Sequence, residues 1–341
     1  MSKKHIILGI ESSCDDTSAA IISEGFILSN IVSSQEIHKK YGGVVPELAS
    51  REHQKNIIPV VDTAIAQAKI KKRDISAICF TQGPGLLGSL IVGSCFAKSF
   101  ALAMNIPLIA VNHMQGHIMA HFIKEEGKIN EYPNFPFLCL TVSGGHTQIV
   151  LVKSFKNMKV IGETLDDAAG EAFDKSAKIL GLPYPGGPLI DKFGKKGDNL
   201  KFIFGRHKVG QLNFSFSGIK TSIRRLIEKN VSENPNFIEE NLNDLCASIQ
   251  HTIVNILIKK LIKASQETGI NSIAIAGGVS ANSYLRNRLL ELENNHKKKV
   301  FIPKFEYCTD NAAMIAISGY YKFLEEQFTD QTIIPKPRFS L

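Results

Sequence analysis

Two histidines one helical turn apart are the residues best suited to chemistry in this sequence. His113 and His117 lie in the run at residues 112–121, and residues four apart share one face of a helix. Imidazole is the commonest metal ligand and binds in its neutral form. The pair therefore predicts a metal site, and the alternative is two surface histidines on an ordinary helix. Met114 replaces the general-base glutamate of an HExxH zinc protease, which argues against that class.

Three loops that follow short apolar segments contain residues suited to a nucleotide. Residues 11–17 (ESSCDDT) offer hydroxyls for phosphate and carboxylates for a metal or its waters. Residues 143–147 (SGGHT) occupy the equivalent place in the second half, where adjacent glycines permit positive φ and an anion-binding nest. Residues 276–282 (AGGVSAN) lead into a helix, whose N-terminus favours anions. The alternative for the first two loops is a polar hairpin turn.

Three acids are placed where helix capping and dipole effects do not fully explain them. Asp174 lies two turns into the helix predicted at 166–180, beside apolar positions, so it does not serve the helix dipole. Asp191 lies one turn after the glycine turn at 184–188. Either acid could accept a hydrogen bond from a ribose hydroxyl. Asp310 precedes the last helix and is either its N-cap or the oxygen ligand that completes the histidine pair.

The order of predicted elements is nearly the same in both halves of the chain, and it indicates an α/β fold. Each half begins with a three-stranded meander and continues with strand–helix units. Such an internal duplication is typical of the actin, hexokinase and sugar-kinase group, whose nucleotide lies in the cleft between two lobes. Two unrelated α/β domains are the alternative. The strands are predicted at 6–11, 17–23, 26–33, 76–81, 107–111, 137–142, 147–152, 158–162, 272–276 and 300–303, and the helices at 47–69, 86–103, 166–180, 217–229, 237–268, 281–295 and 309–325.

The limits of the two lobes follow from this order. We expect an N-terminal actin-like lobe over residues 1–112 and a C-terminal lobe over 113–308. The last helix, at 309–325, is expected to pack back on the first lobe, and residues 326–341 are expected to form an extended tail because they contain prolines.

Composition limits the class of protein. The 341 residues have a formal net charge of +8, which favours a polyanionic partner, although a lysine-rich proteome would give the same balance. None of the six cysteines forms a CxxC pair, so neither a disulfide framework nor a zinc ribbon is indicated. The N-terminal residues lack a signal peptide, and no apolar run is long enough for a membrane span. We expect a cytoplasmic protein without a membrane contact.

Taken together, these motifs resemble the TsaD family of tRNA threonylcarbamoyladenosine synthases. The motifs occur in the family's order and are spread over most of residues 6–317. They are GIESSCDDT (9–17), YGGVVPELASREH (41–53), GPGLLGSL (83–90), NHMQGH (112–117), VSGGHTQ (142–148), DDAAGEAFDK (166–175), YPGGP (184–188), FSFSGIKT (214–221), AGGVSAN (276–282) and CTDNAAMIA (308–316).

The resemblance implies a duplicated actin-like ATPase fold and two groups of site residues. His113, His117 and Asp310 would bind one divalent metal, for which two nitrogens and one oxygen suit Fe²⁺, the preferred ion, or Zn²⁺. The residues that would bind the nucleotide part of the substrate are Thr141, Val142, Ser143, Gly144, Gly145, Asp174, Gly187, Asp191 and Asn282. No side chain is a convincing covalent nucleophile.

The implied reaction transfers a threonylcarbamoyl group from threonylcarbamoyl-AMP to N6 of the adenosine 3′ to the anticodon. The tRNAs would be those that read codons beginning with adenine, and AMP would be released. The implied partners are a TsaB-like paralogue and a TsaE-like ATPase. Two other functions stay open on the same residues. One is a small-molecule kinase that uses Asp15 or Asp16 as its base, and the other is a non-catalytic nucleotide-binding scaffold.

Overall fold

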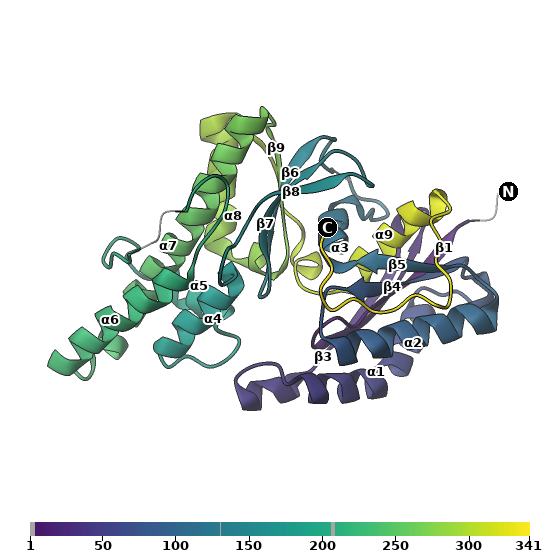
Figure 1. Cartoon of the computed structure of the whole chain (residues 1–341), viewed down its shortest axis with the longest axis horizontal. Helices are drawn as coiled ribbons and strands as arrows, with labels where there is room; N and C mark the ends of the chain where they lie inside the picture. Colours follow the sequence, from purple (N-terminus) through teal and green to yellow (C-terminus); the bar gives the residue numbers. More distant parts are fainter. Residues whose placement is uncertain (1–3, 130, 206–208) are drawn as a thin grey trace. The chain divides into compact units, whose positions relative to one another are not determined.

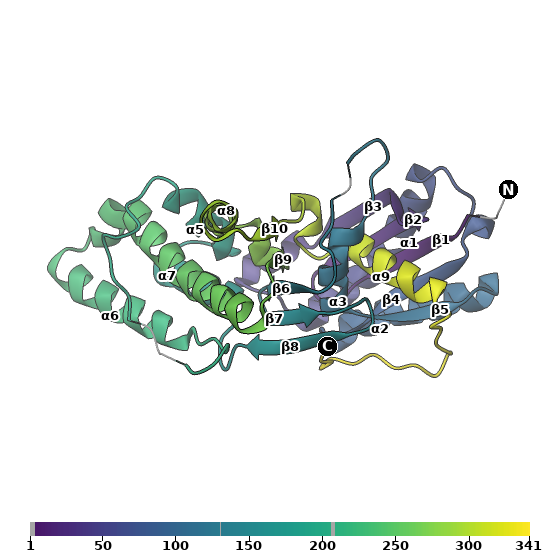
Figure 2. The same ribbon diagram turned by 90° about the horizontal axis from the view of Figure 1, so that it is seen from above.

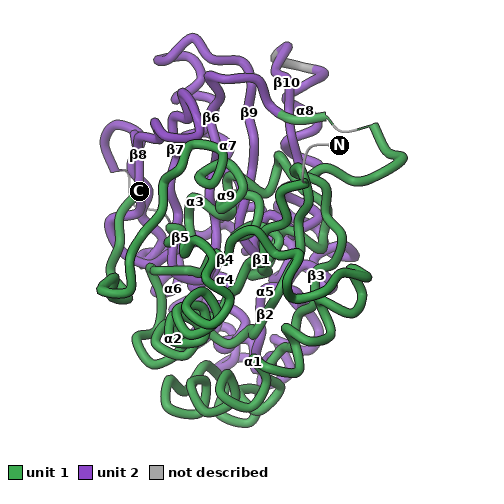
Figure 3. The backbone as a smooth tube through the Cα atoms, turned by 90° about the vertical axis from the view of Figure 1, so that its right-hand side faces the viewer, with its two compact units in different colours: residues 1–132, 303–341 green, residues 133–302 purple. Residues whose placement is uncertain are grey.

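A computed structural model describes residues 4–129, 131–205 and 209–341, and the chain divides into two compact units. Unit 1 comprises residues 1–132 and 303–341, and unit 2 comprises residues 133–302; Figure 3 distinguishes them by colour. Each unit contains one mixed five-stranded sheet with helices packed on it.

The sheet of unit 1 has the strand order β3-β2-β1-β4-β5. The first three strands form an antiparallel meander, and β4 and β5 continue the sheet parallel to β1. The parallel strands are buried almost throughout, as expected for strands covered on both faces. The strands are β1 (Ile6–Glu11), β2 (Asp16–Ser23), β3 (Phe26–Ser34), β4 (Ala77–Gly83) and β5 (Leu108–Asn112).

Helices cover both faces of this sheet. Helices α1 and α2 pack together and against β2, β3 and β4, while α9 lies on β1 and contacts α3; Figures 1 and 2 show the two layers. Helix α1 begins with proline at its first position, where the missing N–H is no loss. The α-helices of unit 1 are α1 (Pro46–Gln67), α2 (Leu87–Met104), α3 (His113–Met119) and α9 (Ala312–Leu324).

Helix α9 lies unusually close to the sheet because two glycines leave room for it. A Cβ atom on Gly9 of β1 would lie 2.7 Å from the carbonyl oxygen of Ala312. A Cβ atom on Gly319 of α9 would lie 2.4 Å from Sγ of Cys79 in β4. Both distances are shorter than any van der Waals contact, so the packing of the last helix on β1 and β4 requires glycine at both positions.

Unit 2 repeats the strand arrangement of unit 1. Its sheet has the order β10-β9-β6-β7-β8, with β6, β7 and β8 as the antiparallel meander and β9 and β10 parallel to β6. The two sheets therefore agree in order and in strand direction, which is the duplication that the sequence predicts. The strands are β6 (Phe137–Val142), β7 (Thr147–Val152), β8 (Met158–Glu163), β9 (Ser272–Ala276) and β10 (Lys299–Phe301).

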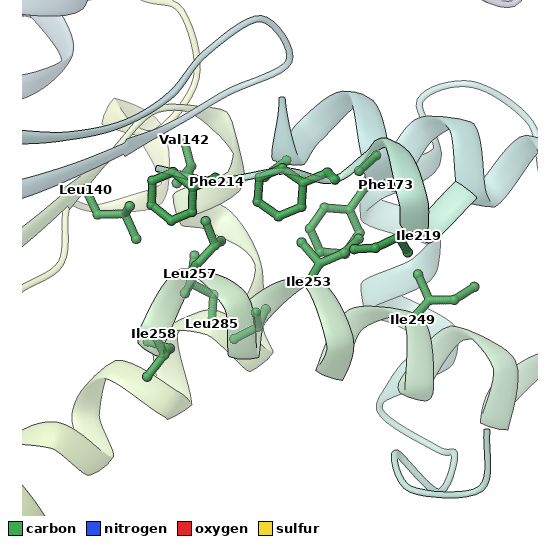
Figure 4. Close-up of a cluster of buried hydrophobic side chains, with 14 of the residues drawn as sticks. Leu140, Val142, Phe173, Phe214, Ile219, Ile249, Ile253, Leu257, Ile258 and Leu285 are labelled. Carbon is green, nitrogen blue, oxygen red and sulfur yellow. The ribbon is translucent and has the colours of Figure 1, made fainter. Parts of the chain in front are cut away.

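The core of unit 2 forms between this sheet and a layer of helices. One apolar cluster buries Phe173 of α4, Leu257 of α7 and Phe214, which precedes α6, together with side chains of β6, as Figure 4 shows. The long helix α7 contacts α4, α5, α6 and α8 and so joins the layer. The helices are α4 (Ala169–Ile179), α5 (Gly186–Gly194), α6 (Ser217–Glu233), α7 (Phe237–Thr268) and α8 (Ser283–His296).

The predicted elements are present with ends shifted by a few residues, but α5 corrects one expectation. The sequence predicts a rigid glycine turn at 184–188, whereas the structure has a helix beginning at Gly186. Proline is tolerated at Pro188, in the first turn of a helix. The first N–H groups are satisfied by a distant side chain, since Oδ1 of Asp174 accepts from the N–H groups of Gly186 and Gly187 at 2.8 and 3.1 Å. A cap supplied by another helix leaves no local sequence signal.

The compact units divide the chain at other points than the predicted lobes. The predicted N-terminal lobe ends at residue 112, whereas unit 1 extends to residue 132 and includes α3, because α3 packs on α9 and β5. The final segment of the chain also belongs to unit 1 (Figure 3). Its backbone N–H groups bond to the sheet, from Thr329 to the carbonyl of Leu108 at 2.9 Å and from Lys336 to that of Gln82 at 2.7 Å.

Two helices are long and apolar enough to cross a membrane by length and composition alone. They are α2 and α7, which corrects the expectation that no apolar run reaches this length. Most of the apolar stretch of α7 is buried in unit 2, and α2 packs on α1 and β4. Core helices of soluble proteins meet the same criterion, so neither helix is a convincing span.

The close packing of α9 on β1 leads to a prediction about stability. Gly9→Ala should lower the free energy of unfolding of unit 1 by about 1–3 kcal/mol, the usual cost of overpacking a core. Gly210→Ala is the control, because no atom lies within 4 Å of the added methyl group there. Denaturant titration of both variants measures the difference. Equal stability of the two variants would contradict the tight contact at Gly9.

Candidate metal centre and nucleotide-binding loops

The two histidines predicted to bind a metal project from α3, which follows β5 without a connecting loop. Asn112 ends the strand and caps the helix, since its Oδ1 accepts from the N–H groups of Met114 and Gln115 at 2.9 and 3.1 Å. His113 and His117 are both buried. Their rings approach edge to face, with centroids 4.7 Å apart, so the predicted helical spacing brings the two imidazoles together.

Asp310 joins the two histidines from the other end of the sequence. Its Oδ1 lies 3.4 Å from Nε2 of His113 and 3.2 Å from Nε2 of His117. The three residues offer ligand atoms within 4.8 Å of one another. Neither ring nitrogen of His117 makes a hydrogen bond of good geometry within the described part of the chain, although buried polar atoms normally have a partner. Two imidazoles, one carboxylate and an unsatisfied buried nitrogen fit a divalent cation.

Glu11 is a further site residue, and its contact with His113 is not apparent from the sequence. Its side chain is fully buried at the end of β1. Oε2 lies 3.0 Å from Nδ1 of His113 and accepts a hydrogen bond from Oγ1 of Thr81 at 2.6 Å. A carboxylate on Nδ1 fixes the ring orientation and leaves Nε2 for the metal. The sequence does show an acid at the end of an apolar strand, which could have marked Glu11 as a candidate site residue. Its partner His113 lies 102 residues away, so the contact itself leaves no local pattern.

The charges of this group determine its protonation when no metal is bound. Burial lowers the pKa of His113, but the carboxylates of Asp310 and Glu11 outweigh burial and hold that pKa well above its usual value. Burial raises the pKa of Asp310, but the two imidazoles lower it more, and the pKa falls below its ordinary range. His113 is therefore protonated near neutral pH in the metal-free protein. A metal must displace this proton, because only neutral imidazole binds it.

The loop predicted to approach a nucleotide is the hairpin between β6 and β7. Ser143 and His146 close it, with the N–H of Ser143 donating to the carbonyl of His146 at 2.8 Å. A Cβ atom on Gly144 or Gly145 would have no neighbour within 4 Å, so the backbone there is open to a ligand. The positive φ that these glycines permit is not used, since neither is among the positive-φ residues. The four-residue loop closes without a left-handed residue.

Two glycines from other segments pack against the carboxyl end of β6. A Cβ atom on Gly170 of α4 would lie 2.5 Å from the carbonyl oxygen of Ser143, and one on Gly277 would lie 2.4 Å from that of Val142. Gly277 also has a φ of +89°, a left-handed conformation that favours glycine. The β6–β7 hairpin, the start of α4 and the loop after β9 therefore meet at one edge of the sheet. Thr141 and Val142 are buried in β6 and can reach a ligand only through their backbone.

The predicted acids of unit 2 hold helix ends in place. Asp174 binds the backbone of Gly187, as described above, and burial raises its pKa. Asp191 of α5 accepts from Oγ and the N–H of Ser283, at 2.7 and 3.2 Å, and so fixes the start of α8. Each acid uses Oδ1 for these bonds. Their roles toward a ribose stay predictions, and the structure adds that both acids also organise the loops.

Asn282 is the N-cap of α8. Its Oδ1 accepts from the N–H of Leu285 at 2.9 Å, and its Nδ2 donates to Oε1 of Gln250 at 2.6 Å. The structure thus places the three candidate metal ligands in unit 1 and all nine candidate nucleotide-binding residues in unit 2.

Two sheets of matching order and direction define an actin-like ATPase fold. Among solved structures, full-length HypF in its phosphate- and nucleotide-bound form superposes with a TM-score of 0.61 at 15% identity, covering 95% of this chain and 47% of that one. Component A of (R)-2-hydroxyglutaryl-CoA dehydratase from Acidaminococcus fermentans gives 0.51 at 15% identity, covering 93% and 98%. At this identity, the likeness concerns the fold alone.

Sequence comparison identifies the family. The family model TsaD, tRNA N6-adenosine threonylcarbamoyltransferase, matches residues 26–317. Curated relatives of that name are 60% identical over 340 residues in Christiangramia forsetii (99% of each chain) and 54% identical over 341 residues in Porphyromonas gingivalis (100% of each). The chain belongs to this family of transferases.

The contact between Glu11 and His113 leads to a prediction about metal affinity. Glu11→Gln keeps the shape but removes the charge, so Zn²⁺ affinity should fall about 10- to 100-fold, the usual effect of losing a carboxylate behind a ligating histidine. Competition with a chromophoric chelator measures it. The matched control is Glu24→Gln, which alters another carboxylate–histidine pair of unit 1, with His5 at 3.0 Å. Unchanged affinity in Glu11→Gln would contradict the assigned role.

Proposed function

We propose that this transferase moves a threonylcarbamoyl group from threonylcarbamoyl-AMP to N6 of the adenosine 3′ to the anticodon. The product is threonylcarbamoyladenosine in tRNAs that read codons beginning with adenine, and AMP is released. The observation that carries the proposal is the 60% sequence identity, over 340 residues, to a curated transferase of this name. The His-His-Asp group, in which both histidines are buried, and the open glycine hairpin support it.

His113, His117 and Asp310 would hold one divalent metal ion. The donor set of two imidazoles and one carboxylate suits iron(II), which we prefer, and also zinc. When bound, the metal supplies a Lewis acid that polarises an oxygen of the substrate. Glu11 contributes by orienting the ring of His113, and it does so through the 3.0 Å contact with Nδ1.

The remaining catalytic task of the protein is to bind and to orient. The N6 amine is a poor nucleophile because its lone pair is delocalised into the ring, whereas the mixed anhydride is already activated by its AMP leaving group. The glycine hairpin with Asp174, Gly187, Asp191 and Asn282 would hold the AMP part. Positioning of this kind lowers the barrier without a covalent intermediate.

Cys14, whose thiol senses the charge of Asp310, does not suit covalent catalysis. Burial, followed by the neighbouring charges of Asp15 and Asp310, raises the pKa of the Cys14 thiol far above its usual value. A thiol held in its neutral form is a weak nucleophile. This supports direct transfer of the group from the adenylate to the amine.

A small-molecule kinase on the same fold is the second candidate function. Its supporting observation is Asp16, because burial raises the pKa of this carboxyl to about 7, and a base with a pKa near the working pH is efficient. A kinase would transfer phosphate to a hydroxyl compound and release ADP. Threonylcarbamoyl transfer releases AMP, so the nucleotide product distinguishes the two.

The proposed reaction also indicates a macromolecular substrate, a cellular compartment and protein partners for this chain. We propose that its macromolecular substrate is tRNA and that it acts in the cytoplasm, where tRNA is modified. A TsaB-like paralogue and a TsaE-like ATPase are its proposed partners, by virtue of the family to which it belongs.

The open hairpin leads to a prediction about nucleotide binding. Gly145→Ala should leave the stability unchanged, because the methyl group would point into open space. The methyl group would occupy space needed by the ligand, so AMP affinity should fall about tenfold, or about 1.4 kcal/mol. Calorimetry compares the AMP affinity of Gly145→Ala with that of Gly210→Ala, because Gly210 is an equally open glycine outside these loops. Wild-type affinity in Gly145→Ala would show that the hairpin does not contact the nucleotide.

Reconstitution tests the reaction itself. The chain is combined with the adenylate-forming enzyme, both partners, threonine, bicarbonate, ATP and unmodified tRNA, and the nucleosides are then analysed. We expect threonylcarbamoyladenosine with the natural tRNA and no product when the acceptor adenosine is replaced by guanosine, whose amine lies on another ring carbon. The guanosine tRNA should bind almost as well, since phosphates dominate affinity. Modification of both tRNAs at similar rates would refute an N6-amine mechanism.

A further inference from the structure

The excess positive charge of this protein is concentrated in one segment. Residues 192–229 contain ten lysines and arginines but only two acids, so this segment alone has a formal net charge of +8, equal to that of the whole chain. The rest of the sequence is balanced. In the structure the segment begins in α5 and ends in α6, both in unit 2. The basic character noted in the sequence is therefore a local property.

Most of the described cations in this segment are not used for folding. Three of them form ion pairs, between Lys195 and Asp191, Lys201 and Asp244, and Arg224 and Glu228, at 3.4, 2.7 and 3.3 Å. Within the described residues the others lie on the surface without an acidic side chain in ion-pair distance. They are Lys192, Lys196, Lys220, Arg225 and Lys229, and together they are named the basic surface below.

Outside this segment the numbers of cationic and acidic side chains are equal. In unit 1 some of the cations pair with acids on their own helices, as in the contact between Arg51 and Glu47, or on neighbouring elements, as between Lys72 and Asp62 at 3.0 Å. An unpaired, hydrated ammonium or guanidinium group remains available to an external anion. Concentration of such groups on one unit raises the local density of anions around it.

The basic surface lies on elements that also contain candidate nucleotide-binding residues. Helix α5 contributes Gly187 and Asp191 to the loops and Lys192 to the basic surface. Helices α5 and α6 both pack on α4, whose Asp174 binds the backbone of Gly187; Figure 1 shows the three helices within unit 2. One rigid helical layer therefore presents both groups of residues.

We propose that the basic surface binds the phosphate backbone of the acceptor RNA. This inference rests on the proposed function, which provides a tRNA as the polyanion. Separate cations on α6 and at the C-terminal end of α5 can each contact a phosphate, and such contacts carry no base specificity. The surface would therefore contribute affinity and orientation, while the choice of nucleotide would be made elsewhere.

Neutralisation of three charges tests the proposal. The test variant is K196Q/K220Q/R225Q. Each phosphate contact contributes about 0.7 (single strand) to about 0.9 (duplex) to the slope of log affinity against log salt, so loss of three contacts should lower this slope by about 2 to 3. At about 0.1 M salt the affinity for an unmodified tRNA should fall on the order of 10- to 100-fold. Fluorescence anisotropy with the full chain gives both quantities.

A matched variant separates local from general charge effects. K69Q/K71Q/R73Q removes the same charge from three exposed residues of unit 1, for which no ion pair is found in the described structure. We expect this control to bind tRNA like the wild type. Equal loss in both variants would show that only net charge matters and would overturn the proposal, as would no loss in either. If polyglutamate or anionic vesicles displaced labelled tRNA as effectively as unlabelled tRNA does, the basic surface would not be specific for RNA.

Two further measurements keep this proposal distinct from the proposed function. AMP affinity and Zn²⁺ content should be unchanged in the test variant, because none of its three residues belongs to the loops or the metal group. The reconstituted reaction with wild-type protein tests the function independently of the surface. Modified nucleoside from the wild type, with unaltered tRNA binding in the test variant, would refute the basic surface alone. Salt-dependent tRNA binding without modified nucleoside would refute the function alone.

Discussion

One buried carboxylate, Glu11, and one half-buried carboxylate, Asp310, impose the constraint on which the site of unit 1 depends. A carboxylate removed from water is stable only when it is paired or hydrogen-bonded. Glu11 and Asp310 both face the imidazole of His113, and Asp310 also faces His117. These residues come from β1, from α3 and from the segment before α9, so the arrangement of three elements is needed to pair the charges. The close approach of α9 to β1 at Gly9 brings Asp310 within reach. A protein that binds a cation here gains the same pairing, which couples the metal to the stability of the unit.

Unit 2 has the same strand arrangement but a different kind of site. At the place where unit 1 has the acidic loop after β1, unit 2 has the hairpin with Gly144 and Gly145, which offers backbone rather than charge. Its acids hold the ends of α5 and α8 by hydrogen bonds to backbone N–H groups. The duplicated fold thus supports two chemistries. One copy concentrates buried charge suited to a metal, and the other presents open backbone suited to a nucleotide.

The net charge follows the same division. The rest of the chain has equal numbers of cations and acids, whereas the segment from α5 to α6 has a formal net charge of +8 and leaves several of its described cations without an ion pair. Exposed ion pairs add little stability, so this difference has little consequence for folding. Its consequence is electrostatic, because unpaired charge on a rigid helical layer attracts and orients a polyanion. The metal group lies in unit 1, whereas the nucleotide loops and the basic surface share one helical layer of unit 2 but consist of different residues, so each group can be mutated separately.

The sequence by itself determined the elements and the family. Period-two and helical patterns placed nearly every strand and helix, the repeated order indicated the duplication, and the spacing of His113 and His117 predicted one helix face. Local pattern could not reveal contacts between distant segments. Helix α5 was missed because Asp174 caps it from another helix, and the sequence did not show that the hairpin at Gly144 and Gly145 closes without positive φ. The partnership of Glu11 with His113 and the inclusion of α3 in unit 1 were decided only by tertiary packing. The physical reason is that hydrogen bonds and buried charges act through space, whereas periodicity records only the near neighbours along the chain.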